Sequence, residues 1–229
     1  MINLMGRLSS DRLSEILDKS ILKKYDCFIE TGTFTGISII PLAKKFKHVE
    51  FHTIEIVEEL YLYAKSKAKL ENIDNLNFHL GDSSTLIEKV INDTQKENVI
   101  IFLDAHSSSY EGYTAESIEK DISENLFSKI KNKVLGKKKK IFTDTKINKL
   151  SDIEVPLLNE LTAISKIKKN FLIVIDDFDL FEKKFNFADW SNINEEKIKK
   201  LFENKITHQF KMSKSGHNSP QLILEIKNK

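Results

Sequence analysis

Ionisable side chains directly follow two of the most apolar segments of the chain. Asp104 and His106 come after one of these segments, and Asp176 and Asp177 come after the other. Because an imidazole titrates near neutral pH, His106 is a candidate general base, and Asp104 is the second catalytic candidate. The alternative for His106 is a ring that only hydrogen-bonds a backbone carbonyl. If both apolar segments are parallel strands, the four side chains open onto one rim.

The three carboxylates also fit a metal site. Asp104, Asp176 and Asp177 offer hard oxygen ligands of the kind that Mg²⁺ prefers. A bound Mg²⁺ would lower the pKa of an acceptor hydroxyl. Helix caps or ion pairs with lysine are the alternative roles for these residues. The sequence therefore predicts a general base, His106, at this rim, and offers a divalent metal site as the alternative use of the carboxylates.

A glycine-containing run, Glu30-Thr31-Gly32-Thr33-Phe34-Thr35-Gly36, lies between an expected strand and an expected helix. In an open α/β sheet, ligands bind at such a junction. Gly32 allows a sharp turn and a close backbone approach to a ligand, while Gly36 allows close packing where the helix starts. The run predicts a nucleotide-like ligand, although two glycines in a turn also occur in proteins that bind none.

Two further acidic residues stand where the same ligand would need them. Glu55 ends the second expected strand, about 23 residues after Gly32, and can accept hydrogen bonds from both ribose hydroxyls. Asp82, or the backbone amide of Ser83, can meet the adenine edge after the third strand. The alternative for Asp82 is a helix cap, since Ser83 and Ser84 follow it.

Alternating segments predict a Rossmann-like, doubly wound α/β fold with right-handed crossovers. The last two segments are separated by too few residues for a crossover helix, which predicts a C-terminal antiparallel hairpin on a mostly parallel sheet of seven strands. The expected strands are 27–30, 50–56, 77–80, 99–103, 171–175, 206–212 and 221–226, and a first helix is expected over 10–23.

The run from Glu30 to Gly36 resembles motif I of class I S-adenosylmethionine-dependent methyltransferases, in the variant form Glu-Thr-Gly-Thr-x-x-Gly. Glu55, Gly81-Asp82 and Leu103-Asp104-Ala105-His106 stand in the places of the following motifs. The resemblance covers roughly residues 26–178 and the hairpin, and it implies S-adenosylmethionine as cofactor. In that family, the first loop holds the methionine part of the cofactor. The residue in the place of Glu55 holds the ribose, and the residue in the place of Asp82 lies by the adenine. The cofactor-binding residues expected in this way are Glu30, Gly32, Thr33, Gly36, Glu55, Asp82, Ser83 and Asp104.

Three comparisons bear on this resemblance: the usual form of motif I, the dehydrogenase fingerprint and the metal-dependent O-methyltransferases. Phe34 stands where the family more often has a middle glycine. A dinucleotide dehydrogenase is the main rival, but its second and third glycines would fall at Phe34 and Ile37, which would accommodate a pyrophosphate poorly. Metal-dependent O-methyltransferases place acidic ligands after the same two strands, and here Asp177 stands where some of those families have asparagine. The expected activity is O-methylation of a small polar acceptor such as a sugar, a glycan precursor or a phosphate-bearing metabolite.

Composition sets limits on the partners. The 229 residues fit a single domain, 1–229, and the formal net charge is only +2. Arginine occurs only at positions 7 and 12, which makes nucleic acid an unexpected partner. Cys27, in an apolar run, is expected to be a buried structural thiol. No signal peptide or membrane helix is expected, so the chain is predicted to be cytoplasmic, with no membrane partner. The oligomeric state stays open.

A lysine-rich insertion around 129–150 does not follow the alternating pattern. It is expected to be a solvated loop, or else a flap that attracts an anionic acceptor. The alternative functions use this segment: a Rossmann-like binding protein for an anionic polymer, or a nucleic-acid methyltransferase. Ser107, Ser108, Ser109, Tyr110 and Tyr113 follow His106 and are candidates to line an acceptor pocket, with a plain solvent loop as the alternative.

Overall fold

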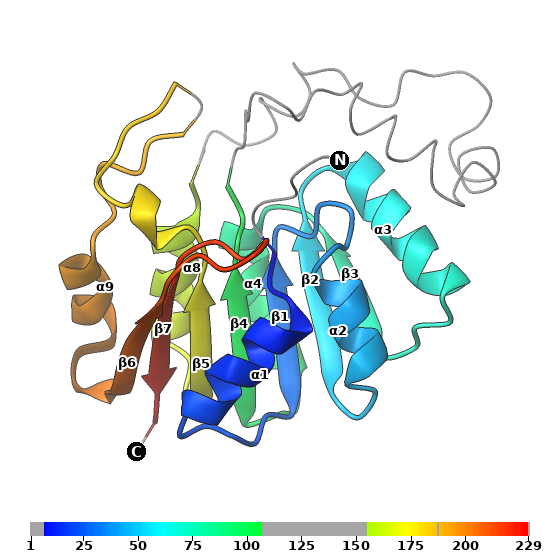
Figure 1. Cartoon of the computed structure of the whole chain (residues 1–229), viewed down its shortest axis with the longest axis horizontal. Helices are drawn as coiled ribbons and strands as arrows, with labels where there is room; N and C mark the ends of the chain where they lie inside the picture. The colour runs from blue at the N-terminus through cyan, green and yellow to red at the C-terminus, as the bar shows by residue number, and fades with distance from the viewer. Residues whose placement is uncertain (1–6, 107–154, 187, 229) are drawn as a thin grey trace.

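The computed structural model describes residues 7–106, 155–186 and 188–228. Its strands are β1 (Cys27–Thr31), β2 (Glu50–Glu55), β3 (Leu76–Leu80), β4 (Asn98–Leu103), β5 (Asn170–Ile175), β6 (Ile206–Met212) and β7 (Gln221–Ile226). They form one seven-stranded sheet in the order β3-β2-β1-β4-β5-β7-β6 (Figure 1). Strand β7 is antiparallel to β5 and β6, and the other neighbouring pairs are parallel. The predicted α/β sheet with its terminal hairpin is confirmed.

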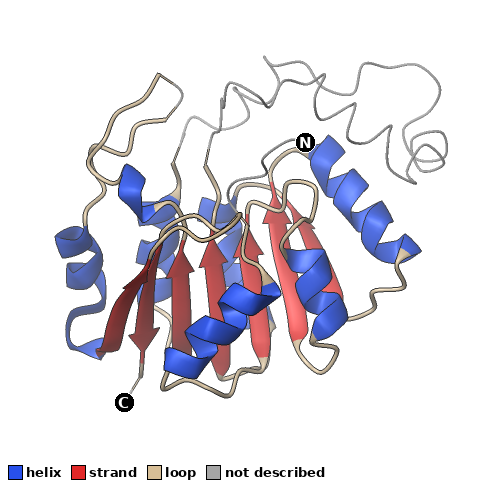
Figure 2. Cartoon of the chain, viewed as in Figure 1, coloured by secondary structure: helices blue, strands red, loops and turns tan. Residues whose placement is uncertain are grey.

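Helices cover both faces of the sheet (Figure 2). They are α1 (Ser10–Lys19), α2 (Ile39–Lys45), α3 (Glu58–Leu70), α4 (Ser83–Asp93), α8 (Leu157–Ser165) and α9 (Glu195–Phe202), with short 3₁₀ turns η1 (Phe178–Leu180) and η2 (Glu203–Lys205). Apolar side chains of α1, α2 and α3 pack into one core, and those of α4, α8 and α9 pack into the other. No described helix is both long and apolar enough to cross a membrane.

The strand register brings three strand ends to one level. Thr31 lies opposite Leu103, and Leu103 lies opposite Ile175. The chain therefore leaves β1, β4 and β5 side by side at the carboxyl edge of the parallel strands, which is the upper edge in Figure 1. Asp104 and Asp176 are the first residues beyond β4 and β5, so they emerge next to each other. This is the edge at which open α/β sheets bind ligands.

Helix α1 is shorter than predicted. Ser9 caps its first turn, as expected, but the helix ends at Lys19 and not near residue 23. Ser20 takes an extended conformation. The next backbone amide, of Ile21, then donates a 2.8 Å hydrogen bond to the Glu225 carboxylate on β7. This contact between distant parts of the chain competes with the helix and could not be read from local spacing.

The predictions about Cys27 and two loop segments have different outcomes. Cys27 is a free thiol and is fully buried, as predicted. Burial raises its pKa to about 12, so the thiol stays protonated and unreactive at neutral pH. The lysine-rich insertion at 129–150 and the polar stretch from Ser107 to Tyr113 lie outside the described residues.

Candidate functional site

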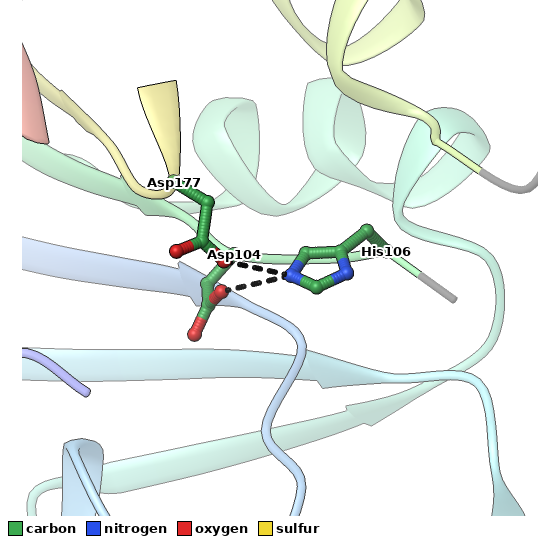
Figure 3. A group of neighbouring side chains, drawn as sticks. All are labelled: Asp104, His106 and Asp177. Carbon is green, nitrogen blue, oxygen red and sulfur yellow. Dashed lines mark ion pairs between the residues drawn. The ribbon is translucent and has the colours of Figure 1, made fainter. Parts of the chain in front are cut away.

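A histidine and two aspartates form a compact cluster at the carboxyl edge (Figure 3). The Nε2 atom of His106 lies 3.2 Å from Oδ2 of Asp177 and 3.6 Å from Oδ1 of Asp104. Asp104 and His106 follow β4, and Asp177 follows β5. Each residue offers one ligand atom, and these three atoms lie within 4.8 Å of one another. The cluster could therefore hold either a proton or a divalent cation.

The two carboxylates set the charge of His106. Burial alone would lower the pKa of the imidazole, but hydrogen bonds and charge attraction from Asp104 and Asp177 outweigh it and raise the pKa well above 6.5. Burial raises the pKa of Asp104 to about 6, against the opposing effect of His106. Burial alone would raise the pKa of Asp177, but the hydrogen bond and charge of His106, with smaller effects from Ser219 and Lys214, outweigh it and lower the pKa. These effects favour an imidazolium held between the two carboxylates.

Asp176, the third predicted metal ligand, is placed differently. Its Oδ1 accepts a 3.0 Å hydrogen bond from the Gln221 side chain, which comes from the start of β7. Burial, with the charges of Asp104 and Asp177, raises the pKa of Asp176 well above its usual value. The structure thus groups His106, and not Asp176, with the other two predicted ligands. Asp176 is the first residue beyond β5, and the chain changes to a left-handed conformation at the next residue, Asp177.

The backbone conformation of Asp177 and an aromatic contact of His106 accompany the pairing of these two side chains. Asp177 has φ 51° and ψ 36°, in the left-handed region that aspartate tolerates better than most residues. The His106 ring packs edge-on against Trp190, with ring centroids 5.4 Å apart. The Phe181 ring in turn stacks on Trp190, with ring centroids 6.2 Å apart. The aromatic pair limits how far the imidazole can turn.

The predicted glycine loop makes a close backbone contact with the end of β4. Gly32 has φ +81°, and a Cβ added there would lie 2.6 Å from the carbonyl oxygen of Asp104. A side chain at this position would therefore clash with backbone. Gly36 has φ +71°, and a Cβ there would lie 2.5 Å from Ile40 of α2. Both glycines are required by the fold of the loop, as the sequence predicts.

Glu30 and Thr33 belong to a buried network beneath this loop. Thr53 donates a 3.0 Å hydrogen bond from its hydroxyl to Glu30, and the hydroxyls of Thr33 and Thr53 lie 2.6 Å apart. Burial raises the pKa of Glu30 well above its usual value, with Asp104 and Glu55 adding to the effect. Burial therefore favours the neutral form of Glu30, which joins the loop through the Thr53 and Thr33 hydroxyls.

Glu55 lies at the end of β2 and holds the same loop from the side. Its Oε2 accepts a 2.7 Å hydrogen bond from the backbone N–H of Phe34, and its Oε1 accepts one of 2.9 Å from Val57. Burial raises the pKa of Glu55 to about 7, although these N–H donors favour the charged form. The carboxylate expected to hold a ribose is thus next to the glycine loop and already oriented by it.

Asp82 and Ser83 begin α4. Asp82 is the N-cap residue and accepts hydrogen bonds from the backbone N–H and the hydroxyl of Ser84, at 2.8 and 2.7 Å. The helix-cap alternative for Asp82 is thereby observed. Ser83 is buried in the first turn of α4. Both residues follow β3, which pairs with β2 so that Leu80 lies opposite Glu55.

Two buried polar residues near this edge were not predicted. Glu160 lies on α8 with no exposed surface, and Gln221 begins β7. Glu160 interrupts the apolar face formed by Leu157, Leu161 and Ile164, so its position on a buried helix face is a signal that the sequence does hold. Gln221 carries no comparable signal, because its contact with Asp176 depends on the hairpin register.

Comparisons with known proteins agree with this arrangement. The sequence model of a family described as "Putative methyltransferase" matches residues 24–107, a span that includes β1 to β4. No curated protein sequence matches the chain significantly. The sequence similarity to this family is therefore limited to a span that contains the glycine loop, Glu55, Asp82 and the end of β4.

Solved structures share the fold at low sequence identity. The structure of EvdMO1 has a TM-score of 0.50 and 9% identity, and the match covers 95% of this chain and 40% of that one. The N-terminal domain of EvdMO1 with S-adenosylhomocysteine bound has a TM-score of 0.50 and 9% identity, with 99% and 83% covered. Magnesium protoporphyrin IX methyltransferase from Synechocystis PCC 6803 with S-adenosylmethionine bound reaches 0.48 at 13% identity, with 95% and 77% covered. The chain thus spans less than half of the full EvdMO1 chain, and it resembles class I methyltransferases in fold.

Proposed function

From this resemblance, we propose that the protein is an S-adenosylmethionine-dependent methyltransferase that methylates an oxygen of a small polar acceptor. The observation that carries the proposal is the convergence, at one sheet edge, of the Gly32 loop and Glu55 with the cluster of Asp104, His106 and Asp177. Isothermal titration of the folded protein with S-adenosylmethionine tests it directly. A titration without heat of binding, on protein with an intact unfolding transition, would overturn the proposal.

The cofactor would lie along the ends of β1, β2 and β3. The turn at Gly32 leaves room for the methionine part, Glu55 would accept hydrogen bonds from the ribose, and Asp82 with Ser83 would face the adenine. Support comes from the N-terminal domain of EvdMO1, which shares the fold and binds S-adenosylhomocysteine. The cofactor needs no pyrophosphate cradle, which fits a loop with Phe34 at its centre.

The cluster of Asp104, His106 and Asp177 would remove the acceptor's proton. Methyl transfer is an in-line displacement on a carbon activated by the sulfonium, so the protein mainly aligns the acceptor and accepts its proton. His106 in its neutral form would take the proton, and the two carboxylates would stabilise the resulting imidazolium. An oxygen acceptor suits this site because a hydroxyl must lose its proton to become a good nucleophile.

A divalent cation is the second reading of the same three residues. Asp104, His106 and Asp177 fit such an ion because their ligand atoms lie close together and two of them are carboxylate oxygens. The cation would lower the pKa of an acceptor hydroxyl. His106 would then be a ligand and not the base. Two carboxylates and an imidazole suit Mn²⁺ or Zn²⁺ at least as well as the Mg²⁺ expected from carboxylates alone.

The acceptor class is best sought by screening. Phosphorylated sugars, nucleotide sugars and catechol-like compounds, each incubated with protein and methyl-labelled S-adenosylmethionine, cover the small polar acceptors that the site would accept. Label in an alkali-stable ether product supports O-methylation. Label only in an amine product would replace the oxygen acceptor with nitrogen and leave the cofactor assignment in place.

A further inference from the structure

Glu160 is a buried carboxyl group that the proposed chemistry does not use. It has no exposed surface, and within the described residues neither of its oxygens makes a hydrogen bond of standard geometry. The nearest hydroxyls, of Ser83 and Thr31, still act on it: burial raises its pKa to about 7, and these two hydroxyls oppose that rise. The carboxylates of Asp82 and Asp104 favour its neutral form.

The two neighbouring hydroxyls belong to the two loops that would hold the cofactor. Thr31 is the last residue of β1 and directly precedes Gly32, while Ser83 is the first residue of α4 and directly follows Asp82. Thr31 is fully buried, and its hydroxyl also lacks a partner of standard geometry within the described residues. Glu160 on α8 therefore lies near the bases of both loops, on the α4 and α8 side of the sheet.

A carboxyl group at this place is costly to keep. Burying a polar group without good hydrogen bonds destabilises the fold, whereas a leucine would extend the apolar face of Leu157, Leu161 and Ile164. A packing role alone does not account for a glutamate here. Buried polar groups that cost stability are characteristic of functional sites, where position matters more than the free energy of folding.

We propose that Glu160 is a positioning residue of the cofactor site, which fixes the Gly32 loop relative to the start of α4 by bridging the hydroxyls of Thr31 and Ser83. The neutral carboxyl donates its O–H to one hydroxyl and accepts from the other through its carbonyl oxygen. The inference rests on the proposed cofactor binding. It adds a residue that acts through Thr31 and Ser83 without touching the cofactor.

The test compares two replacements of Glu160 by titration with S-adenosylmethionine and by thermal unfolding. Glu160→Gln keeps one donor and one acceptor, so its Kd is expected to stay within about threefold of the parent. Glu160→Leu keeps the volume but removes the bridge, so its Kd is expected to rise at least about tenfold while Tm does not fall. Opposite changes in affinity and stability are the signature that a merely structural residue would not give.

The matched control is Glu225→Leu. Glu225 is also a fully buried glutamate with an oxygen that lacks a partner among the described residues, but it lies on β7 opposite Leu172, and β4 and β5 separate β7 from β1 in the sheet. The Glu225→Leu variant is expected to have a lower Tm than the parent and the same Kd for S-adenosylmethionine. Thr31→Val provides a second route if Glu160→Leu does not fold, because it removes one end of the bridge and should weaken binding about threefold or more.

Several outcomes overturn the inference. If Glu160→Leu or Thr31→Val binds S-adenosylmethionine with the parent's Kd, the bridge does not contribute to binding. If Glu160→Gln binds as weakly as Glu160→Leu, the site needs the charge of Glu160 and not its hydrogen bonds. These results are distinguishable from failure of the proposed function, which would appear as absence of binding in the unmodified protein.

Discussion

The backbone N–H of Phe34 donates a 2.7 Å hydrogen bond to the carboxylate of Glu55. Phe34 also has φ +50°, so it takes the left-handed conformation for which related loops use glycine. The residue that departs from the usual motif therefore keeps the backbone shape of the motif. Glu55 is at once a candidate ribose ligand and the anchor of the loop that would hold the rest of the cofactor.

Replacing Glu55 should therefore affect stability and affinity together. Glu55→Ala leaves the N–H groups of Phe34 and Val57 without their acceptor, at a cost of about 1–3 kcal/mol. We expect a lower Tm and a Kd for S-adenosylmethionine at least about tenfold higher, measured by calorimetry. Glu71→Ala, which removes only the surface ion pair with Lys44, is the control and should change neither. Parent-like affinity in Glu55→Ala would remove Glu55 from the cofactor site.

His106 should matter for turnover more than for cofactor binding. Its Nε2 faces the carboxylates of Asp104 and Asp177, so His106→Ala removes the proton acceptor and leaves the glycine loop intact. We expect kcat to fall by about 10²–10⁴-fold, with the Kd for S-adenosylmethionine little changed. His217→Ala, in the exposed turn between β6 and β7, is the matched control. Equal turnover in His106→Ala and the parent would exclude the base role.

The pH dependence of methyl transfer follows from the charge of His106. Because hydrogen bonds to the two aspartate carboxylates raise the pKa of the imidazole above 6.5 despite its burial, the neutral base accumulates only above that pH. The rate should therefore rise with pH along a limb that lies above 6.5. Asp177→Asn removes one carboxylate, so the limb should move to lower pH by about one unit. A limb that moves upward, or stays in place, would contradict the assignment.

Metal binding would depend on the same three side chains. After dialysis against a chelator, titration with Mn²⁺ and Mg²⁺ should show tighter binding of Mn²⁺, because one of the three ligands is an imidazole. Binding should tighten as pH rises, since the cation displaces the proton of His106. Asp177→Asn should weaken binding, whereas Asp176→Asn, which changes a residue bonded to Gln221, should not. If Asp176→Asn weakens binding as much, the metal set predicted from the sequence is the better one.

A second histidine pair makes stability sensitive to acid. The Nδ1 atom of His52 lies 3.0 Å from Nε2 of His79, and Nε2 of His52 lies 3.0 Å from Glu50. Burial lowers the pKa of both histidines below 6.5. The unfolded chain therefore binds more protons below pH 6.5, and this pair's contribution to stability is lost as pH falls from 6.5 toward the lowered values.

His79→Gln keeps a donor toward His52 and removes one titrating group. Between about pH 7.5 and about pH 5.5, the free energy of unfolding should fall less in the variant than in the parent. The difference should be on the order of 1 kcal/mol or less, as measured by urea unfolding. The exposed His48→Gln is the control and should follow the parent. An identical pH dependence in His79→Gln and the parent would mean that the pair does not titrate in this range.

Local patterns were sufficient where neighbouring residues decide the structure. Strands β6 and β7 have the predicted bounds, because the short segment between them left little choice. The site was predictable as far as it follows strand ends, since parallel strands bring their carboxyl ends together. What could not be predicted depends on contacts between distant segments: the early end of α1 at Glu225, the place of His106 beside Asp177, and the direction of Glu160.

The contact between Gly32 and the carbonyl of Asp104 has a practical consequence for engineering. An added methyl group at Gly32 would meet that carbonyl at 2.6 Å, so the two backbone segments pack directly against each other with no room for a side chain between them. Libraries that diversify residues after β4 to change the proposed acceptor would therefore also disturb the loop that is proposed to hold the cofactor. Selections for new acceptors should therefore enrich compensating changes around residues 31–36, even when those residues never meet the new compound.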